Sequence, residues 1–312
     1  MKNTIETFSA LGARLLGFGD DDATRAVIDS ACRANGWFTP ADIRRAVRAI
    51  ACDMLQREKL EAWLADYPVL PVAEPRRVLV VMAGNIPLVG FFDLLCVLVS
   101  GHGCLVKPSA KDSVLMEHVV GLLREIDPSA PVRLYDGTSP VDAVIATGSD
   151  NANRYFRAHY AGIPSLLRGS RQSVAVLSGR ETPEQLAGLA DDIWAYSGLG
   201  CRSVSLIFAP EGYEPALQIP PVNDKYINNY RQQRSLLEMQ GRPFVDLGCA
   251  VAVEQCAFPA ALSRIAYAHY ATLDEVVAWL AGHDGELQCV VTGCLPHSRR
   301  AGFGSAQSPA LT

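Results

Sequence analysis

Short, continuously apolar segments alternate with longer amphipathic ones after residue 71, and this alternation is the strongest constraint on the fold. Continuous apolar strands separated by helices are typical of a parallel sheet that helices cover on both faces. The pattern therefore predicts a doubly wound α/β sheet. We expect strands near 77–82, 104–107, 132–135 and 143–146, with helices near 87–100 and 112–123 and from Asp150 onward.

A second α/β region is expected to begin at about Ser203. The last residues of the chain, 307–312, show no capping element, which suggests that a final segment is missing. The strands expected in the second region are 204–208, 244–246 and 287–291, with a helix near 274–281.

Residues before the proline-rich boundary at 67–71 are expected to be helical. The aspartates 20–22 can cap a helix that runs to Gly36. Pro40 suits the first position of a second helix. We expect this helix to continue to Leu64, because apolar residues recur along it at helical spacing.

The composition excludes several classes of protein. The chain has 312 residues, of which 49% are hydrophobic and 20% are charged, and its net charge is -5. The length suggests about two domains, and no basic stripe indicates a nucleic-acid partner. The nine cysteines are odd in number and never spaced as Cys-x-x-Cys, and no His-Glu-x-x-His pattern occurs. We therefore expect neither a disulfide framework nor a bound metal.

We expect a soluble, cytoplasmic protein without a membrane partner. The first residues lack the charged and then apolar architecture of a signal peptide. The longest apolar stretch, 86–99, contains Asp93 and is too short to span a bilayer.

Cys201 lies at a junction between a helix-like segment and an apolar strand. The run Gly198-Leu199-Gly200-Cys201 places two glycines before it. A substrate can approach a thiol in such a place, and backbone N–H groups can point at it, which favours thiolate chemistry. The alternative is a buried structural cysteine, because free cysteines are among the most buried residue types.

Three further turns follow predicted strands, at the edge where doubly wound sheets bind ligands. In Gly84-Asn85-Ile86-Pro87, the Asn85 amide could donate to an oxyanion, or Asn85 could cap the next helix. In Lys107-Pro108-Ser109, the lysine could reach ribose or phosphate oxygens, or be a solvated charge. Thr147-Gly148-Ser149 suits a pyrophosphate at a helix N-terminus, or an ordinary helix cap. Neither a Gly-x-Gly-x-x-Gly fingerprint after a strand nor a P-loop pattern occurs, so those standard nucleotide sites are disfavoured.

In this order, the four segments resemble the aldehyde dehydrogenase superfamily. The resemblance is greatest to its fatty acyl-CoA reductase (LuxC-like) branch, because of the segments 80–90, 168–173 and 303–309, and it extends from about Arg77 to Pro309. It implies an aldehyde-dehydrogenase-like α/β fold, with a doubly wound cofactor domain and a smaller α/β catalytic domain. The implied parts are an N-terminal helical segment (1–70), a nucleotide-binding domain (71–197), a catalytic domain (198–295) and a return segment toward the cofactor domain (296–312).

The resemblance also implies roles for individual residues. Cys201 matches the nucleophile, and Asn85 matches the residue that stabilises the oxyanion together with the Cys201 backbone N–H. The nicotinamide cofactor is expected to be NADPH. Its adenosine ribose would be held by Lys107 and Ser109, and its phosphates would lie near Thr147, Gly148 and Ser149.

One departure from the wider superfamily bears on the reaction. Oxidative aldehyde dehydrogenases carry a glutamate that activates water to hydrolyse the acyl-enzyme, but the comparable stretch here, 166–171, has no carboxylate. An acyl-cysteine would therefore survive for reduction. We expect a reductase that converts an acyl thioester, carried by CoA or an acyl-carrier protein, to an aldehyde. The resemblance implies that the acyl group is a fatty acyl group. His159 is a candidate proton carrier, or else a surface histidine.

Two alternatives stay open. The substrate could be an acyl phosphate, as in the glutamyl-phosphate-type reductases of the same superfamily. The chain could instead be a catalytically silent scaffold that binds an acyl carrier. The sequence does not decide between CoA and a carrier protein, between NADPH and NADH, or between a monomer and a homo-oligomer.

Overall fold

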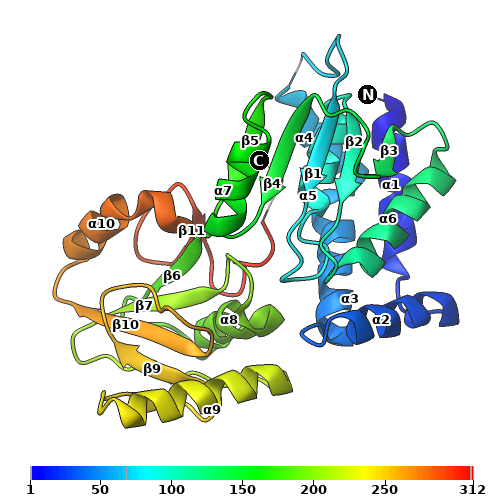
Figure 1. Cartoon of the computed structure of the whole chain (residues 1–312). Helices are drawn as coiled ribbons and strands as arrows, with labels where there is room; N and C mark the ends of the chain where they lie inside the picture. Colours follow the sequence, from blue (N-terminus) through cyan, green and yellow to red (C-terminus); the bar gives the residue numbers. More distant parts are fainter. Residues whose placement is uncertain (1, 68, 310, 312) are drawn as a thin grey trace. The chain divides into compact units, whose positions relative to one another are not determined.

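The computed structural model describes residues 2–67, 69–309 and 311, and the chain divides into two compact units (Figure 1). The first unit runs to Ser170 and also includes Leu311, and the second unit comprises residues 171–309. The division comes earlier than the expected boundary between residues 197 and 198. The reason is that β6 (Gln172–Val176) pairs with β7 (Val204–Pro210) and β11 (Leu287–Thr292) of the second sheet.

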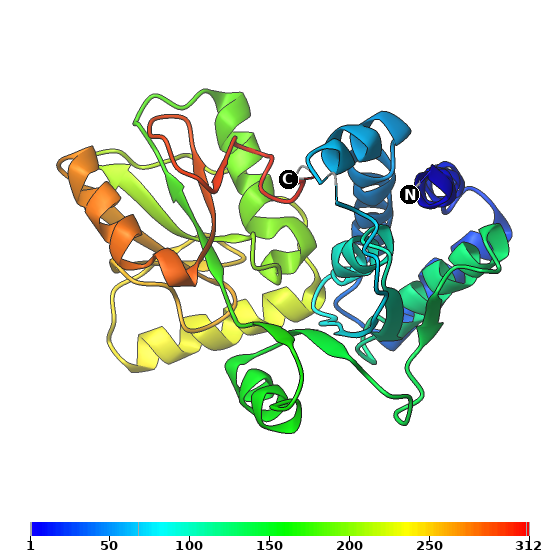
Figure 2. The ribbon, with the colours of Figure 1, turned by 90° about the horizontal axis from the view of Figure 1, so that it is seen from above.

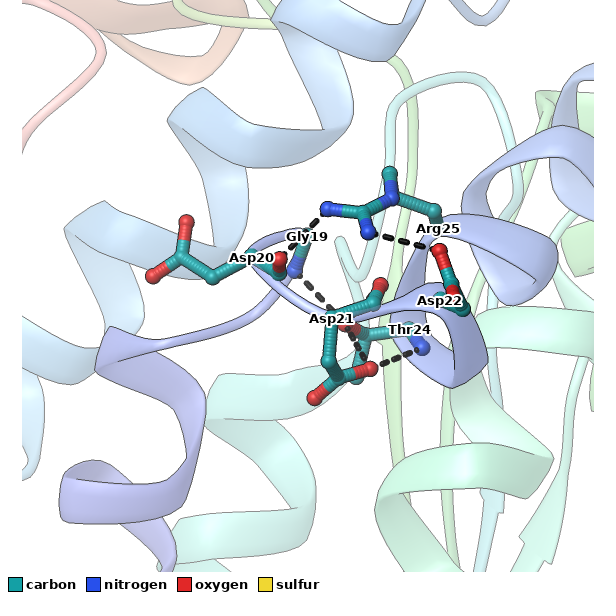
Figure 3. A network of polar contacts seen from close by, with 6 residues as sticks. All are labelled: Gly19, Asp20, Asp21, Asp22, Thr24 and Arg25. Carbon is teal, nitrogen blue, oxygen red and sulfur yellow. Dashed lines mark hydrogen bonds and ion pairs between the residues drawn. The ribbon is translucent and has the colours of Figure 1, made fainter.

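The first unit begins with helices, as the sequence predicts. Helix α1 (Lys2–Leu16) is followed by α2 (Asp22–Ala34). Asp21 caps α2, because its carboxylate accepts a hydrogen bond from the Thr24 backbone N–H at 2.7 Å (Figure 3). The Arg25 Nη2 atom lies 2.7 Å from Asp22 Oδ1, so the aspartate run both caps the helix and pairs with a cation in its first turn.

The predicted helix from Pro40 to Leu64 is interrupted. It forms α3 (Pro40–Ala49), a π-helical turn (Ile50–Met54) and α4 (Arg57–Ala65). The backbone leaves the helix at Leu55, where α1 approaches so closely that a Cβ on Gly12 would lie 2.8 Å from the Leu55 Cβ. The expectation of one continuous helix is wrong, because periodicity carries no information about this tertiary contact.

A parallel sheet in the order β3-β2-β1-β4-β5 forms the centre of the first unit. The order reverses between β1 and β4, which confirms the doubly wound arrangement. The strands are β1 (Arg77–Val81), β2 (Gly103–Lys107), β3 (Val132–Leu134), β4 (Ala143–Thr147) and β5 (Ser165–Arg168). The helices between them are α5 (Phe91–Val99), α6 (Ser113–Ile126) and α7 (Asp150–His159).

Alternate residues of β1 pack on opposite faces of this sheet. Val78 and Val80 join the large apolar core that the N-terminal helices share with α5 and α6. Leu79 packs on the other face, where α7 lies beside β4 and β5 (Figure 1). Both faces of the central strands are therefore covered, which explains the continuous apolar runs of β1 and β2.

The second unit has a sheet in the order β12-β11-β6-β7-β10-β9-β8, in which only the pairing of β8 with β9 is antiparallel among the described residues. An apolar cluster joins Val276 and Leu280 of α10 to the central strands, and α9 packs against β9. Figure 2 shows these helices from above. The remaining elements are α8 (Pro183–Trp194), a 3-10 turn (Ala195–Gly198), α9 (Asp224–Met239), β8 (Val245–Asp246), β9 (Val251–Glu254), β10 (Arg264–Tyr270), α10 (Leu273–Gly282), a second 3-10 turn (Asp284–Glu286) and β12 (Arg300–Ala301).

Within residues 2–67 and 69–309, no helix combines the length and the apolar character needed to cross a membrane. Over the same described ranges, no group of three or more His, Cys, Asp or Glu side chains is arranged to hold a metal ion.

Candidate active site

The carboxyl ends of β1, β2 and β4 meet at one edge of the first sheet. In the register of the sheet, Val81 of β1 lies beside Lys107 of β2 on one side and beside Ala146 of β4 on the other. The turns that follow these strands are the asparagine turn (84–87), the lysine turn (107–109) and the threonine–glycine–serine turn (147–149). The structure therefore brings these three predicted segments to the edge where doubly wound sheets bind their ligands.

The asparagine turn and the lysine turn are packed directly against each other. A Cβ on Gly84 would lie 2.7 Å from both the Cβ and the Oγ of Ser109, so only glycine permits this approach. The buried Asn35, which follows α2, donates from Nδ2 to the Gly84 carbonyl oxygen at 3.4 Å. The N-terminal helices thus help to fix the position of the asparagine turn.

Asn85 does not cap the following helix. Helix α5 begins at Phe91 with Gly90 in the N-cap position, so the expected helix start near residue 87 is wrong and the capping alternative for Asn85 fails. The cause is the backbone between them: Leu88 is left-handed, with φ at 55°. Its N–H donates to Asp112 Oδ2 at 2.9 Å.

Asp112 is a buried acid beneath this turn. It is 2% exposed, and among the described residues its Oδ1 atom has no hydrogen-bond partner. Burial raises the pKa of Asp112 to about 8, against a smaller opposing effect of the hydrogen bond from Leu88. The carboxyl group that holds the asparagine turn is therefore mostly protonated at neutral pH.

Lys107 and the threonine–glycine–serine turn offer binding groups at the same edge. The Lys107 side chain is exposed at the end of β2. Ser149 accepts a hydrogen bond from the Ala152 N–H at 3.4 Å and so caps α7, which confirms the capping alternative for this serine. The first turn of α7 nevertheless presents backbone N–H groups at this edge, where an anion would be favoured.

Arg168 ends β5, inside the stretch that lacks a glutamate. Its Nη1 atom pairs with Oδ1 of Asp93 on α5. The Asp93 side chain is 10% exposed and that of Arg168 is 45% exposed, so a nearly buried carboxylate holds a half-exposed guanidinium. The stretch 166–171 therefore carries a cation and contains no carboxylate for the activation of water.

The structure does not bring His159 to this edge. Helix α7 starts at the edge and runs back along the sheet, and His159 is its last residue, roughly 15 Å from its start at 1.5 Å per residue. The His159 ring stacks on Tyr155 with centroids 5.4 Å apart. A role in proton transfer stays a prediction, and the geometry of the first unit does not support it.

Cys201 follows α8 and a strained turn in the second unit. Tyr196, Ser197 and Gly198 have φ values of 53°, 55° and 66°. Two consecutive non-glycine residues in the left-handed region indicate backbone strain of the kind that clusters at functional sites. Cys201 is exposed, as is Cys256, whereas the other cysteines are partly or fully buried. The alternative of a buried structural cysteine is therefore wrong for Cys201.

Hydrogen bonds and charges surround the Cys201 thiol. The buried Ser173 donates from Oγ to the Cys201 carbonyl oxygen at 2.9 Å. Although part of the residue is reachable from solvent, the surrounding protein displaces water and raises the pKa of the thiol. The Arg202 and Arg171 guanidinium groups and the backbone N–H groups of Cys201 and Arg202 act in the opposite direction and lower it. The turn thus opposes ionisation by burial but supplies groups that stabilise a thiolate.

Two segments that were singled out in the sequence only by their resemblance to a family make hydrogen bonds to the residues around Cys201. Ser173 belongs to the segment 168–173, and Gln307 belongs to the segment 303–309. Gln307 donates from Nε2 to Ser203 Oγ at 3.3 Å, at the end of the turn that carries the nucleophile, the cysteine turn (residues 198–203). The resemblance of both segments to the family was the signal in the sequence, but no rule of spacing assigned either residue to the cysteine.

A hollow of about 260 Å³ lies elsewhere in the first unit. Arg77, Cys104 and Val132, which line it, belong to the amino ends of their strands. It therefore lies at the opposite edge of the sheet from the turns described above and contributes nothing to them.

The fold is that of the aldehyde dehydrogenases. The acetylating aldehyde dehydrogenase of Geobacillus thermoglucosidasius is similar with a TM-score of 0.66 at 12% identity, over 100% of this chain and 86% of that one. The aldehyde dehydrogenase of Mycobacterium tuberculosis, solved with NAD+, is similar with a TM-score of 0.59 at 16% identity, over 88% of this chain and 70% of that one. At these identities the likeness concerns the fold, and it confirms the predicted fold class.

Residues 33–218 match the acyl-CoA reductase (LuxC) family, and the chain belongs to this family, as the sequence predicts. The long-chain acyl-protein thioester reductase of Vibrio harveyi is 28% identical over 174 residues, which cover 49% of this chain and 36% of the relative. The long-chain acyl-protein thioester reductase 2 of Photobacterium leiognathi is 24% identical over 175 residues, covering 50% and 37%. The matched part thus spans little more than a third of the length of these curated relatives.

Proposed function

We propose that this chain reduces an acyl thioester to an aldehyde through an acyl-cysteine on Cys201, with NADPH as the hydride donor. The observation that supports this most strongly is the solvent-accessible Cys201, which follows a strained turn and whose thiolate is favoured by the Arg202 guanidinium and by backbone N–H groups. Membership of the LuxC family supports an acyl substrate. We assign a fatty acyl group carried by CoA or by a protein, because the curated relatives are named long-chain acyl-protein thioester reductases.

The proposed first step is acyl transfer to the cysteine. The Cys201 thiolate attacks the carbonyl carbon, a new C–S bond forms, and the bond to the carrier sulfur breaks, so that the carrier leaves as a thiolate that takes up a proton. The carbonyl oxygen bears the negative charge of the tetrahedral intermediate. The Cys201 backbone N–H and the Asn85 amide are the donors that we assign to this oxygen.

The acyl-cysteine would persist because the stretch 166–171, where oxidative aldehyde dehydrogenases carry their water-activating glutamate, offers no base for its hydrolysis. The stretch 166–171 contains no carboxylate, and its Arg168 is paired with Asp93. A guanidinium cannot deprotonate water, since it stays protonated at all accessible pH values. Reduction is therefore favoured over hydrolysis as the fate of the acyl-enzyme.

The carboxyl edge of the first sheet fits a dinucleotide. Lys107 supplies a cation, and Ser109 supplies a hydroxyl beside the space that a Cβ on Gly84 would fill. The turn 147–149 adds the N-terminus of α7 for phosphate oxygens. When bound there, NADPH would supply the hydride that brings the acyl group to the oxidation level of an aldehyde. The choice of NADPH over NADH is part of the proposal and is tested by titrating the protein with each.

Intact-mass spectrometry tests the proposal directly. The protein is mixed with acyl-CoAs of several chain lengths, and NADPH is added afterwards. We expect an adduct of the acyl mass that maps to Cys201 and disappears on addition of NADPH, with release of the aldehyde. The Cys201→Ala variant should form no adduct, whereas Cys256→Ala, which removes the other exposed cysteine of the second unit, should label like the wild type.

Adduct formation that survives in Cys201→Ala would refute the assignment of the nucleophile. Absence of an adduct with every acyl-CoA and with an acyl-carrier protein would refute the thioester substrate. An adduct with an acyl phosphate would then identify the acyl-phosphate alternative, and no adduct with any acyl donor would identify the silent scaffold.

A further inference from the structure

The segment 303–307 is bound to α8 by a fully buried carboxylate. Asp192 is 0% exposed, and its Oδ2 atom accepts a hydrogen bond from the Gly304 N–H at 2.7 Å. Its Oδ1 atom accepts a second hydrogen bond from the Ala306 N–H at 2.9 Å. Two backbone donors on one buried carboxylate fix the path of this segment, because hydrogen bonds to a charged acceptor are stronger than neutral ones.

Backbone contact reinforces this attachment. A Cβ on Gly188 of α8 would lie 2.8 Å from the Gly304 backbone nitrogen, so the helix and the segment touch through their main chains. Gly304 itself has φ at 78°, in the region that favours glycine. Larger residues at either position would push the segment away from α8.

The other side of the same segment contacts the cysteine turn. Arg202 donates from Nη1 to the Ala306 carbonyl oxygen at 3.3 Å, and Gln307 donates to Ser203 Oγ at 3.3 Å. The Ala306 residue therefore lies between the Asp192 carboxylate, which accepts from its N–H, and the Arg202 guanidinium, which donates to its C=O. The segment connects a buried anion on α8 with a cation beside the nucleophile.

We propose that Asp192 and the segment 303–307 are positioning elements for the nucleophile: they hold the Arg202 guanidinium beside Cys201, where it stabilises the thiolate. The inference rests on the proposed function, in which Cys201 must ionise before it attacks the thioester. Since a guanidinium stays charged at every working pH, the position of its side chain decides how strongly it acts on the thiol. The hydrogen bonds that support this role join Asp192 to the backbone of Gly304 and Ala306, and Gln307 to Ser203, so the proposed contribution of both residues to the thiolate is indirect.

Other ionisable groups face this part of the second unit. Arg171, before β6, also lowers the pKa of the Cys201 thiol. The buried Cys289 of β11 is affected by the charges of Arg202, Asp192 and Cys201, and its own pKa is raised mainly by burial. Cys289 stays a neutral thiol near neutral pH and adds no charge beside Cys201. Of the groups that lower the pKa of the Cys201 thiol, the Arg202 guanidinium has the largest effect.

The rate at which iodoacetamide alkylates Cys201, measured against pH on the peptide that contains this residue, tests the proposal. Arg202→Gln should raise the pH midpoint of alkylation by about one unit, which lowers the rate at pH 7 by about tenfold. Arg202→Lys keeps the charge and should recover most of that rate. Asp192→Asn should shift the midpoint in the same direction as Arg202→Gln, because one of the two side-chain oxygens that accept backbone N–H groups is replaced by an NH2 donor. The control Arg180→Gln removes an exposed arginine elsewhere in the second unit and should leave the midpoint unchanged.

An unchanged midpoint in Arg202→Gln, with the circular dichroism spectrum of the wild type, would overturn the role of Arg202. If Asp192→Asn does not fold, Gln307→Ala, which removes a half-buried side chain, tests the segment instead and should produce a smaller shift of the same sign. A wild-type midpoint in every folded segment variant would overturn the positioning role. The assay uses no acyl substrate, so its outcome is independent of the acyl-adduct experiment that tests the proposed function.

Discussion

Asp112 should make the stability of the first unit depend on pH in a direction opposite to that of most acidic residues. Burial raises its pKa from 3.8 to about 8. Between these two values the unfolded chain has lost the proton while the folded chain keeps it. The folded state therefore binds more protons, and the free energy of unfolding falls as the pH rises through this window.

The size of the effect follows from the pKa shift. Each pKa unit corresponds to about 1.36 kcal/mol, so the loss between pH 5 and pH 7 is about 3 kcal/mol. Asp112→Asn keeps an oxygen that can accept from Leu88 and removes the titration. We expect this variant to gain about 3 kcal/mol over the wild type on going from pH 5 to pH 7. Asp112→Ala leaves the buried Leu88 N–H without its acceptor and should be about 1–3 kcal/mol less stable than Asp112→Asn.

Hydrogen exchange of peptides from α5 reports the stability of the first unit separately from that of the second unit. It is compared at equal pH among the wild type, Asp112→Asn and Asp112→Ala. Urea unfolding at pH 5 and pH 7 gives the corresponding free energies. Parallel pH profiles for the wild type and Asp112→Asn would refute the reasoning, because they would show that Asp112 is ionised in the folded state at little cost.

Three further variants test the first unit. Lys107→Ala should raise the KM for the nicotinamide cofactor by about tenfold and leave acyl transfer to the cysteine intact, and steady-state kinetics with mass spectrometry would separate the two effects. Gly90→Ala places a Cβ against the Met82 side chain and should lower the free energy of unfolding in urea by about 1–3 kcal/mol. In the control Gly121→Ala no atom lies within 4 Å of the new Cβ, so its free energy of unfolding should rise by up to about 1 kcal/mol. His159→Gln should leave the pH dependence of kcat unchanged, because α7 carries this residue away from the carboxyl edge; loss of one limb of the profile would restore it as the proton carrier.

Hydrophobic patterning was sufficient to predict four of the five strands of the first sheet, because helices cover both faces of its centre; it did not predict β5, whose residues are mostly exposed. Val78, Leu79 and Val80 are all buried, and an uninterrupted apolar run can be satisfied only in such a layer. Patterning was insufficient where a contact distant in the sequence changes the backbone. The break at Leu55 depends on the approach of Gly12, and the delayed start of α5 depends on Asp112, and neither partner shows in the local sequence.

The sequence identified the cysteine and the strand-end turns but not the residues that hold them. Cys201 and Asn85 could be located because glycines and a proline mark their turns and the order of the turns resembles a family. Asp192, by contrast, occupies an ordinary helical position, and its hydrogen-bond partners lie more than a hundred residues further along the chain. A side chain that acts on a distant backbone leaves no periodic pattern, so only the structure reveals it.

Each unit thus has a buried acid that accepts backbone N–H groups near a proposed reactive group: Asp112 from Leu88 after the asparagine turn, and Asp192 from the segment that contacts the cysteine turn. The two acids should respond differently to the same substitution. Asp112 accepts one N–H, and its other oxygen has no partner within the described part of the chain, so an amide in its place removes a buried titration without losing the hydrogen bond from Leu88. Asp192 accepts two N–H groups, and an amide would set its own NH2 against one of them. We therefore expect Asp112→Asn to raise, and Asp192→Asn to lower, the free energy of unfolding at pH 7 in urea. If the two substitutions change the free energy of unfolding equally, then the number of backbone N–H groups that each acid accepts does not determine how much its carboxylate contributes to stability.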